Sequence, residues 1–251
     1  MVYVRDHLHF YRMEHATNIL YRAGDRGHRN FGWLDTYHTF SFGDYHHPER
    51  MGFGALRVFN DDTVHGGMGF DEHPHQNMEI ISIPLQGALV HADSTGTESS
   101  IHPGEVQVMS AGTGVTHSEF NGYRDRMLKF LQIWILPNEI GVEPRYQQAH
   151  VELNNNFVTG VVGPMNSSSM LWIHQNAWLS LLKLDAGKTA HYTSHREGNG
   201  TFTFIVSGQA TVENELLHER DAIGIATPSA IEIAAQKDVY AVIIDVPMTR
   251  G

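Results

Sequence analysis

The chain has 251 residues, 41% of them hydrophobic and 18% charged, which suits one large all-β domain or two small ones and is too apolar for a disordered chain. Its 28 acidic residues outnumber 17 lysines and arginines, and the net charge of -11 disfavours direct binding to nucleic acid. No apolar run approaches the ~20 residues of a membrane-spanning helix. Met1–Ala16 is too polar for a secretory signal, so a cytoplasmic protein is expected.

Cysteine is absent, whereas histidine occurs 18 times. Without cysteine the chain has no disulfides, no thiolate nucleophile and no sulfur-rich metal site. Any bound metal must therefore be held by nitrogen and oxygen. Most of the histidines, such as those in the polar N-terminal stretch, are expected to be ordinary solvated side chains.

Short apolar runs separated by Gly, Pro, Asn and Asp dominate the chain. Examples are Ala55–Asn60 before two aspartates, Glu79–Leu85 before Gln86-Gly87, and Leu128–Leu136 before Pro137-Asn138. This punctuation predicts β-strands and turns. Helices should be scarce, although the pattern leaves room for a short one near the second half.

The first candidate for chemistry is a His-x-His pair, His73 and His75. On a strand, positions i and i+2 share a face and lie roughly 6.5 Å apart at about 3.3 Å per residue, close enough to converge on one ion. Glu79 has the same parity if the strand continues regularly. Taken alone, such a pair is more often a polar strand edge than a metal site.

A second pair, His117 and Glu119, alternates in the same way about forty residues later, after a Gly-rich turn. Two such pairs on adjacent strands would form one inward-facing site. Three imidazoles and one carboxylate suit iron, manganese, nickel, copper or zinc and leave up to two coordination positions open.

The two halves of the chain look like degenerate copies of one pattern, a strand, a glycine turn and a second strand, centred on Gly87 and on Gly208. Alignment on these turns places Ser194, Arg196 and Gly200 opposite His73, His75 and Glu79, and Ile233 and Ala235 opposite His117 and Glu119. The second half is therefore predicted to bind no metal and to complete the core or the mouth of the site.

Three segments together carry a resemblance to a known family. The order Gly-x5-His-x-His-x3-Glu, followed by a Gly-rich turn and His117, resembles the two motifs of the cupin superfamily. More narrowly, Trp33–Phe42, His73-Pro74-His75 and Thr113–Glu119 resemble the bacterial pirin-like proteins, over about residues 20 to 248.

The resemblance implies an all-β bicupin, two antiparallel jelly-roll β-barrels packed together. The expected division is an N-terminal extension at 1–18, a metal-binding barrel at 19–150 and a degenerate, metal-free barrel at 151–251. The least patterned region lies between about residues 141 and 169, which would suit a linker between the halves.

For the metal, the resemblance implies His73, His75, His117 and Glu119 as ligands. Glu79 stands where other cupins place a carboxylate ligand and is the alternative; otherwise it would orient a ligand histidine. One divalent transition metal is expected, Fe(II) first, with manganese, nickel, copper or zinc open because spacing does not separate them.

The implied activity is that of a quercetin 2,3-dioxygenase, in which a flavonol meets dioxygen at the metal and its central ring opens with loss of carbon monoxide. Glu119 would accept the flavonol proton. The alternation of His38, Phe40 and Phe42 on one predicted strand face, and of Gln132 with Trp134, indicates either a pocket for a flat aromatic ligand or core packing.

Three other hypotheses stay open. The physiological substrate could be another enol or catechol-like aromatic, since cupin folds host several activities. In a different class, the chain could be a non-catalytic, redox-sensing regulator whose metal controls binding to a protein partner. A third hypothesis is a vestigial site whose metal serves folding.

Overall fold

The computed structural model describes residues 18–249, so the predicted N-terminal extension lies outside the described residues except for Asn18. The all-β prediction is confirmed: 22 strands account for the regular structure, and the one helical segment in this part of the chain is the 3-10 turn η1 (Ala23–Asp25). No helix within residues 18–249 is long and apolar enough to cross a membrane.

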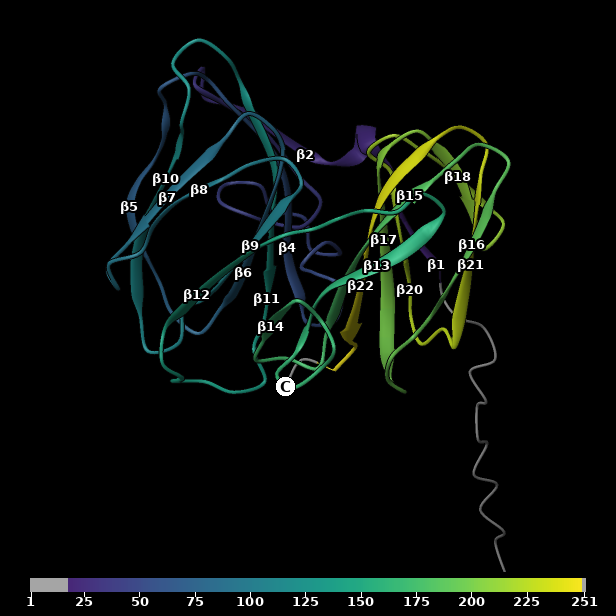
Figure 1. The fold of residues 1–251 in the computed structure, drawn as a ribbon. Helices are drawn as coiled ribbons and strands as arrows, with labels where there is room; N and C mark the ends of the chain where they lie inside the picture. The colour runs from purple at the N-terminus through teal and green to yellow at the C-terminus, as the bar shows by residue number, and fades with distance from the viewer. Residues whose placement is uncertain (1–17, 250–251) are drawn as a thin grey trace, which may run out of the picture.

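The first half consists of two antiparallel sheets, one of seven strands in the order β12-β9-β6-β11-β4-β3-β2 and one of four in the order β5-β10-β7-β8 (Figure 1). Its strands are β2 (Gly27–Asn30), β3 (Leu34–His38), β4 (Leu56–Val64), β5 (Gly69–His75), β6 (Glu79–Gln86), β7 (Leu89–Asp93), β8 (Glu98–Ile101), β9 (Glu105–Ser110), β10 (Val115–Asn121), β11 (Leu128–Ile135) and β12 (Arg145–His150).

The second half repeats this architecture with sheets in the orders β1-β20-β17-β22-β15-β13-β14 and β16-β21-β18-β19. Its strands are β1 (Asn18–Tyr21), β13 (Phe157–Pro164), β14 (Leu171–Ile173), β15 (Trp178–Leu184), β16 (Thr189–Thr193), β17 (Asn199–Ser207), β18 (Gln209–Val212), β19 (Glu215–His218), β20 (Ala222–Ile225), β21 (Ala230–Ala235) and β22 (Val239–Pro247). Strand β1 pairs with β20 although it precedes the first half in the chain. The predicted division at residue 150 stays a prediction.

The largest apolar core lies between the halves, where the two seven-stranded sheets meet (Figure 1). Phe202 of β17 is fully buried there, with its ring centroid 5.3 to 6.1 Å from the rings of Tyr21, Phe40, Phe53 and Phe59. The rings are tilted against Phe202 by 45 to 56°, and such a cluster contributes a large buried aromatic area. It joins residues from both ends of the chain into one core.

Strand alternation decides which side chains of the large sheets face this shared core. On β6, Ile81 and Ile83 belong to the core between the halves, whereas Ile80 packs inside the first half. Because neighbouring residues on a strand face opposite sides, Ser82 points into the first half with Ile80. The interior of that half therefore receives polar as well as apolar side chains from β6.

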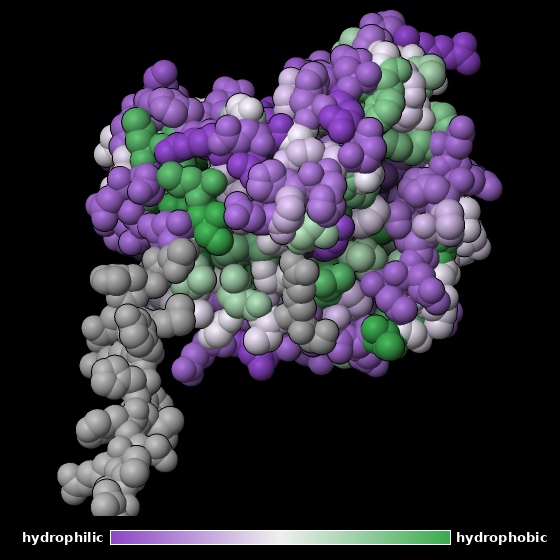
Figure 2. Space-filling view, turned by 180° about the vertical axis from the view of Figure 1, so that it is seen from behind, coloured by the Kyte–Doolittle hydropathy of each residue, from purple (hydrophilic) through white to green (hydrophobic). Residues whose placement is uncertain are grey.

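The outer surface shows no single large apolar face in the view of Figure 2, where small hydrophobic patches are separated by hydrophilic residues. Exposed large hydrophobic side chains are scattered over the chain, and Ile140 and Phe157 are the most exposed of them. Scattered exposed apolar residues of this kind are ordinary for a folded protein.

Candidate metal centre

Three histidines converge on the inner face of the four-stranded sheet of the first half. Strands β5 and β10 are antiparallel neighbours, with His73 opposite His117 and His75 opposite Val115. The ligand atoms of the three imidazoles lie within 4.8 Å of one another, and the Nε2 atoms of His73 and His117 are 3.1 Å apart. His117 is buried, while His73 and His75 are half-buried towards the opening.

Glu119 joins this cluster through His117. The β10 side chains alternate strictly, with positions 115, 117, 119 and 121 buried, although a bulge interrupts the pairing with β5 between His117 and Glu119. Glu119 forms an overlapping group with His117 and His91, again within 4.8 Å. Its carboxylate accepts hydrogen bonds from Ser82 Oγ at 3.2 Å and Gln132 Nε2 at 2.7 Å.

Burial sets the charge state of these groups. Desolvation and the neighbouring imidazoles lower the pKa of His75 to about 4 and that of His117 to about 2, so both present uncharged nitrogen lone pairs. Burial raises the pKa of Glu119 to about 7 against the opposing hydrogen bonds from Ser82 and Gln132. Three imidazole nitrogens within 4.8 Å of one another beside a buried carboxylate fit a divalent transition metal.

His91, which the sequence interpretation did not single out, lies directly behind His117. Its Nδ1 is 3.4 Å from His117 Nδ1, and its Nε2 is 2.9 Å from Asp93 Oδ2. A carboxylate only accepts hydrogen bonds, so His91 Nε2 carries the proton and His91 Nδ1 accepts from His117 Nδ1–H. This arrangement leaves the His117 Nε2 lone pair facing His73.

A signal for His91 was present in the sequence. His91 and Asp93 alternate on β7, which pairs with β10 so that His91 lies opposite Glu119 and Asp93 opposite His117. Asp93 is itself held by the backbone N–H groups of Thr95 and Thr97 at its other oxygen. A second His-x-acid alternation, beside that of His117 and Glu119, therefore marked the strand next to the predicted ligands.

Glu79, the alternative ligand, lies elsewhere. Strand β5 ends at His75, a turn with Asn77 at φ 48° follows, and Glu79 begins β6 in the other sheet, so the regular strand assumed for its parity does not exist. Glu79 shares a face with Ile81 and accepts a hydrogen bond from Ser110 Oγ at 2.7 Å. The histidine it contacts is His174 of the second half, at 3.2 Å, and among residues 18–249 it belongs to no candidate metal group.

A small cavity of about 190 Å³ opens onto the histidines. It is lined by Phe42, Asn60, Asp62, Phe70, His73, His75, Glu119, Gln132 and Trp134. The Trp134 ring stands edge-on to His75 and to Phe42, with centroid distances of 4.9 and 5.3 Å. Burial raises the pKa of Asp62 to about 7, although Thr36 donates a hydrogen bond to its carboxylate.

Of the four residues predicted to line a substrate pocket, two line the cavity and two do not. Phe42 and Gln132 line the cavity, whereas His38 lies behind it and its Nδ1 donates to Asn60 Oδ1 at 2.9 Å. Phe40 packs in the core between the halves. The shared face expected for 38, 40 and 42 was wrong because β3 ends at His38 and the chain turns there. Asn60, Asp62 and Phe70 were missed.

The sequence of the chain matches two protein-family models. Residues 22–135 match the model described as Pirin, and residues 160–246 match the quercetinase C-terminal cupin domain. The quercetin 2,3-dioxygenase of Escherichia coli strain K12 is 39% identical over 234 residues, covering 91% of this chain and 98% of that protein. The chain belongs to the pirin family.

Solved pirin structures share its fold. YhhW from Escherichia coli superposes with a TM-score of 0.89 at 37% identity, over 94% of this chain and 100% of that one. The same bacterial pirin in complex with nickel(II) gives a TM-score of 0.87 over 92% and 99% of the two chains. A pirin-like protein of Caulobacter vibrioides is 35% identical over 87% of this chain and 95% of its own. The bicupin prediction is thereby confirmed, and a divalent metal site is supported without its metal being identified.

In this pirin the second half has no histidine or carboxylate at the positions equivalent to the four predicted metal ligands. His91 and Val212 are equivalent because each lies four residues after the turn glycine of its half, Gly87 or Gly208. On the neighbouring strand, Glu119 lies opposite His91 and Ile233 lies opposite Val212, so Glu119 and Ile233 are equivalent too. The same register makes Tyr192, Ser194, Ile231 and Ile233 the counterparts of His73, His75, His117 and Glu119.

The alignment read from the sequence was therefore wrong by two residues on these strands. The turn between β16 and β17 is longer than that between β5 and β6, and β20 is shorter than β9. Tyr192, Ile231 and Ile233 are buried in the apolar core of the second half. Counting along a sequence does not reveal such compensating changes in loop and strand length.

Proposed function

We propose that this chain is a metal-dependent dioxygenase that cleaves a flavonol or a related enol- or catechol-like aromatic. The observation that carries the proposal is a cavity that joins the His73, His75 and His117 cluster to aromatic walls. Pirin relatives named quercetin 2,3-dioxygenase support the same reaction class.

His73, His75, His117 and Glu119 would hold one divalent ion. When bound, the ion supplies a Lewis acid and a template on which an enol oxygen and dioxygen are brought together. Fe(II) is our first candidate, with Mn(II), Ni(II), Cu(II) or Zn(II) as alternatives, since a nitrogen-and-oxygen donor set accepts each of them.

Glu119 is the residue we assign to proton transfer. Its buried carboxylate lines the cavity beside the histidines, where it is placed to accept a proton from an enol hydroxyl and to release it again. Ser82 and Gln132 keep hold of the carboxylate by hydrogen bonds, so its position is defined while its charge changes.

His91 and Asp93 would orient His117. With Asp93 fixing the proton of His91 on Nε2, the hydrogen bond at 3.4 Å keeps the other proton on His117 Nδ1. Both side chains of the His91–Asp93 pair are buried, so water does not compete for these bonds.

The cavity walls limit what enters. Phe42, Phe70 and Trp134 offer ring faces and edges to a flat aromatic group, and Asn60 and Asp62 offer polar contacts to its hydroxyls. About 190 Å³ is less than the ~300–1,000 Å³ of typical ligand sites. The site would therefore enclose one ring of the substrate and leave the remainder at the opening.

The test is dioxygen consumption with quercetin by metal-free protein reconstituted anaerobically with ferrous, manganous, nickel or cupric ion. Uptake that appears with a metal and disappears in His117→Ala supports the proposal. Tight metal binding without uptake, for quercetin and for simpler catechols and enols, would favour the redox-sensing regulator instead, whose metal state should alter binding to a protein partner.

A further inference from the structure

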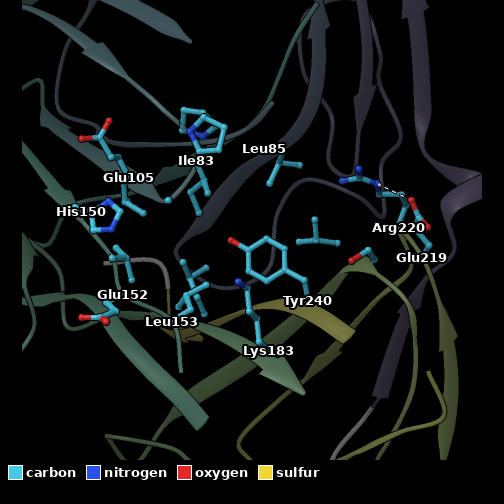
Figure 3. Close-up of a pocket in the computed structure, with 18 residues that line it drawn as sticks. Ile83, Leu85, Glu105, His150, Glu152, Leu153, Lys183, Glu219, Arg220 and Tyr240 are labelled. Carbon is cyan, nitrogen blue, oxygen red and sulfur yellow. Dashed lines mark ion pairs between the residues drawn. The ribbon is translucent and has the colours of Figure 1, made fainter. Parts of the chain in front are cut away.

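A second cavity, of about 540 Å³, lies in the cleft between the two halves (Figure 3). It shares no lining residue with the cavity at the histidines. It is lined by Ile83, Pro84, Leu85, Pro103, Gly104, Glu105, Val106, His150, Val151, Glu152, Leu153, Leu181, Lys183, Val206, Ser207, Glu219, Arg220 and Tyr240. Interfaces between domains are frequent places for small-molecule sites.

The floor of the cleft is apolar and comes from both halves. Ile83 and Val106 belong to β6 and β9 of the first half, and Leu181 and Val206 to β15 and β17 of the second. All four are buried members of the core between the halves. Leu85 and Leu153, which are half-buried and pack against this core, leave apolar surface in the cleft that a ligand would cover.

Two hydrogen-bond donors stand together above this floor. Lys183 of β15 and Tyr240 of β22 are directly opposite in the antiparallel pair, so their side chains lie on one face. Among the described residues neither side chain takes part in a hydrogen bond or an ion pair. Figure 3 shows the Tyr240 phenol extending into the cleft beside the Lys183 amine. Burial raises the pKa of Tyr240 to about 12, so the phenol keeps its proton and donates.

The other charged groups of the cleft define its two ends. Arg220 and Glu219 lie at one end (Figure 3), where Arg220 is engaged by Glu219 at 3.8 Å and by Asp61 at 3.5 Å. Glu105 and Glu152 lie with His150 at the opposite end (Figure 3). Lys183 stands between the two ends (Figure 3) and would match one negative charge, whereas a second charge near either end would meet a glutamate.

We propose that the cleft is a second ligand site that binds a small amphipathic monocarboxylate, with its carboxylate on Lys183 and Tyr240 and its apolar body on the floor. The ammonium would donate to one carboxylate oxygen and the uncharged phenol to the other, and both bonds are charge-assisted because the acceptor is ionised. The site is separate from the metal centre and does not depend on the reaction proposed there.

The experiment compares 4-phenylbutyrate with the uncharged 4-phenylbutan-1-ol as probes, by calorimetry and ligand-observed NMR on the metal-loaded full chain. Lys183→Met should weaken the acid about tenfold or more and leave the alcohol unchanged, as expected when one charge-assisted bond is lost. Tyr240→Phe should weaken the acid less. Lys188→Met, which removes the same charge from an exposed position after β15, is the matched control and should change neither.

His117→Ala separates this cleft from the metal centre. Binding of the acid should persist in that variant whether or not flavonol turnover is ever observed. Three results would overturn the proposal: no binding of the acid by the intact chain, equal binding by Lys183→Met, or binding that is lost with the metal.

Discussion

The two halves of this pirin share the order of their central strands but not one chemistry. In the first, His73, His117 and Glu119 face inward; in the second, the same positions hold Tyr192, Ile231 and Ile233. These three side chains on equivalent strands thus decide whether the interior offers ligand atoms to an ion or packs as an apolar core. The scaffold supplies position, and the inward-facing residues supply function.

The two interiors also differ in whether their buried acceptor atoms find hydrogen-bond donors. Asp245 is fully buried in the second half, and its Oδ2 accepts hydrogen bonds from Tyr192, Ser194 and the backbone N–H of His195. The first half instead brings imidazole acceptors face to face, with His73 and His117 nitrogens 3.1 Å apart. Protein donors satisfy Oδ2 of the buried carboxylate in one half, whereas a cation would satisfy the converging nitrogens in the other.

The largest expected effect is loss of the metal in His117→Ala. Removing a ligand should weaken binding by more than the 10–100-fold typical of outer partners, hence by at least about 100-fold. Metal content after dialysis against a chelator measures it. Tyr192→Phe, near the counterpart position in the second half, is the control and should retain the metal of the intact chain. Equal metal in both variants would place the site elsewhere.

Phe202→Ala tests whether the halves behave as one unit. Removing this ring from the core between them should lower the free energy of unfolding by about 3–5 kcal/mol, as for other buried phenylalanines. Denaturant unfolding followed by fluorescence and by far-ultraviolet dichroism should still show one transition at lower denaturant. Two separated transitions would mean that the halves unfold independently.

His91→Ala should weaken metal binding by about 10–100-fold without removing a ligand. The reason is that His117 loses the partner that fixes its tautomer. Competition with a chromophoric chelator and the visible spectrum of the cobalt(II) form would register both affinity and geometry. Glu79→Gln is the matched control, since Glu79 also contacts a histidine but faces the second half; its metal affinity should stay within about threefold.

The smallest expected effect is a loss of unfolding free energy at alkaline pH, to which tyrosines of both halves contribute. Burial raises the pKa of Tyr21, Tyr146 and Tyr240 to about 12, above the ordinary value near 10. The unfolded chain releases these protons first, so their contribution to stability is complete below pH 10 and is lost as pH rises through 12. Urea unfolding at pH 8, 10 and 11.5 measures the loss, and Tyr21→Phe should reduce it. If the variant and the intact chain showed the same pH dependence, Tyr21 would not contribute to the loss of stability.

The sequence by itself determined the all-β class, the repeat of two halves and the convergence of three histidines. These depend on short-range rules: turn residues punctuate strands, and positions two apart share a face. His73, His75, His117 and Glu119 were found in that way because each pair lies within one strand. His91 and Asp93 also lie two positions apart on one strand, so the same rule could have identified them from the sequence.

Only the tertiary structure decided the relations between strands. Glu79 turns away from the histidines because the chain leaves one sheet for another at Asn77, and Phe40 joins the shared core because β3 has already ended. The equivalence of Tyr192 with His73, and the pairing of Lys183 with Tyr240 in the cleft, depend on the register of antiparallel neighbours. Register is set by packing and loop length over the whole fold, so local sequence patterns do not contain it.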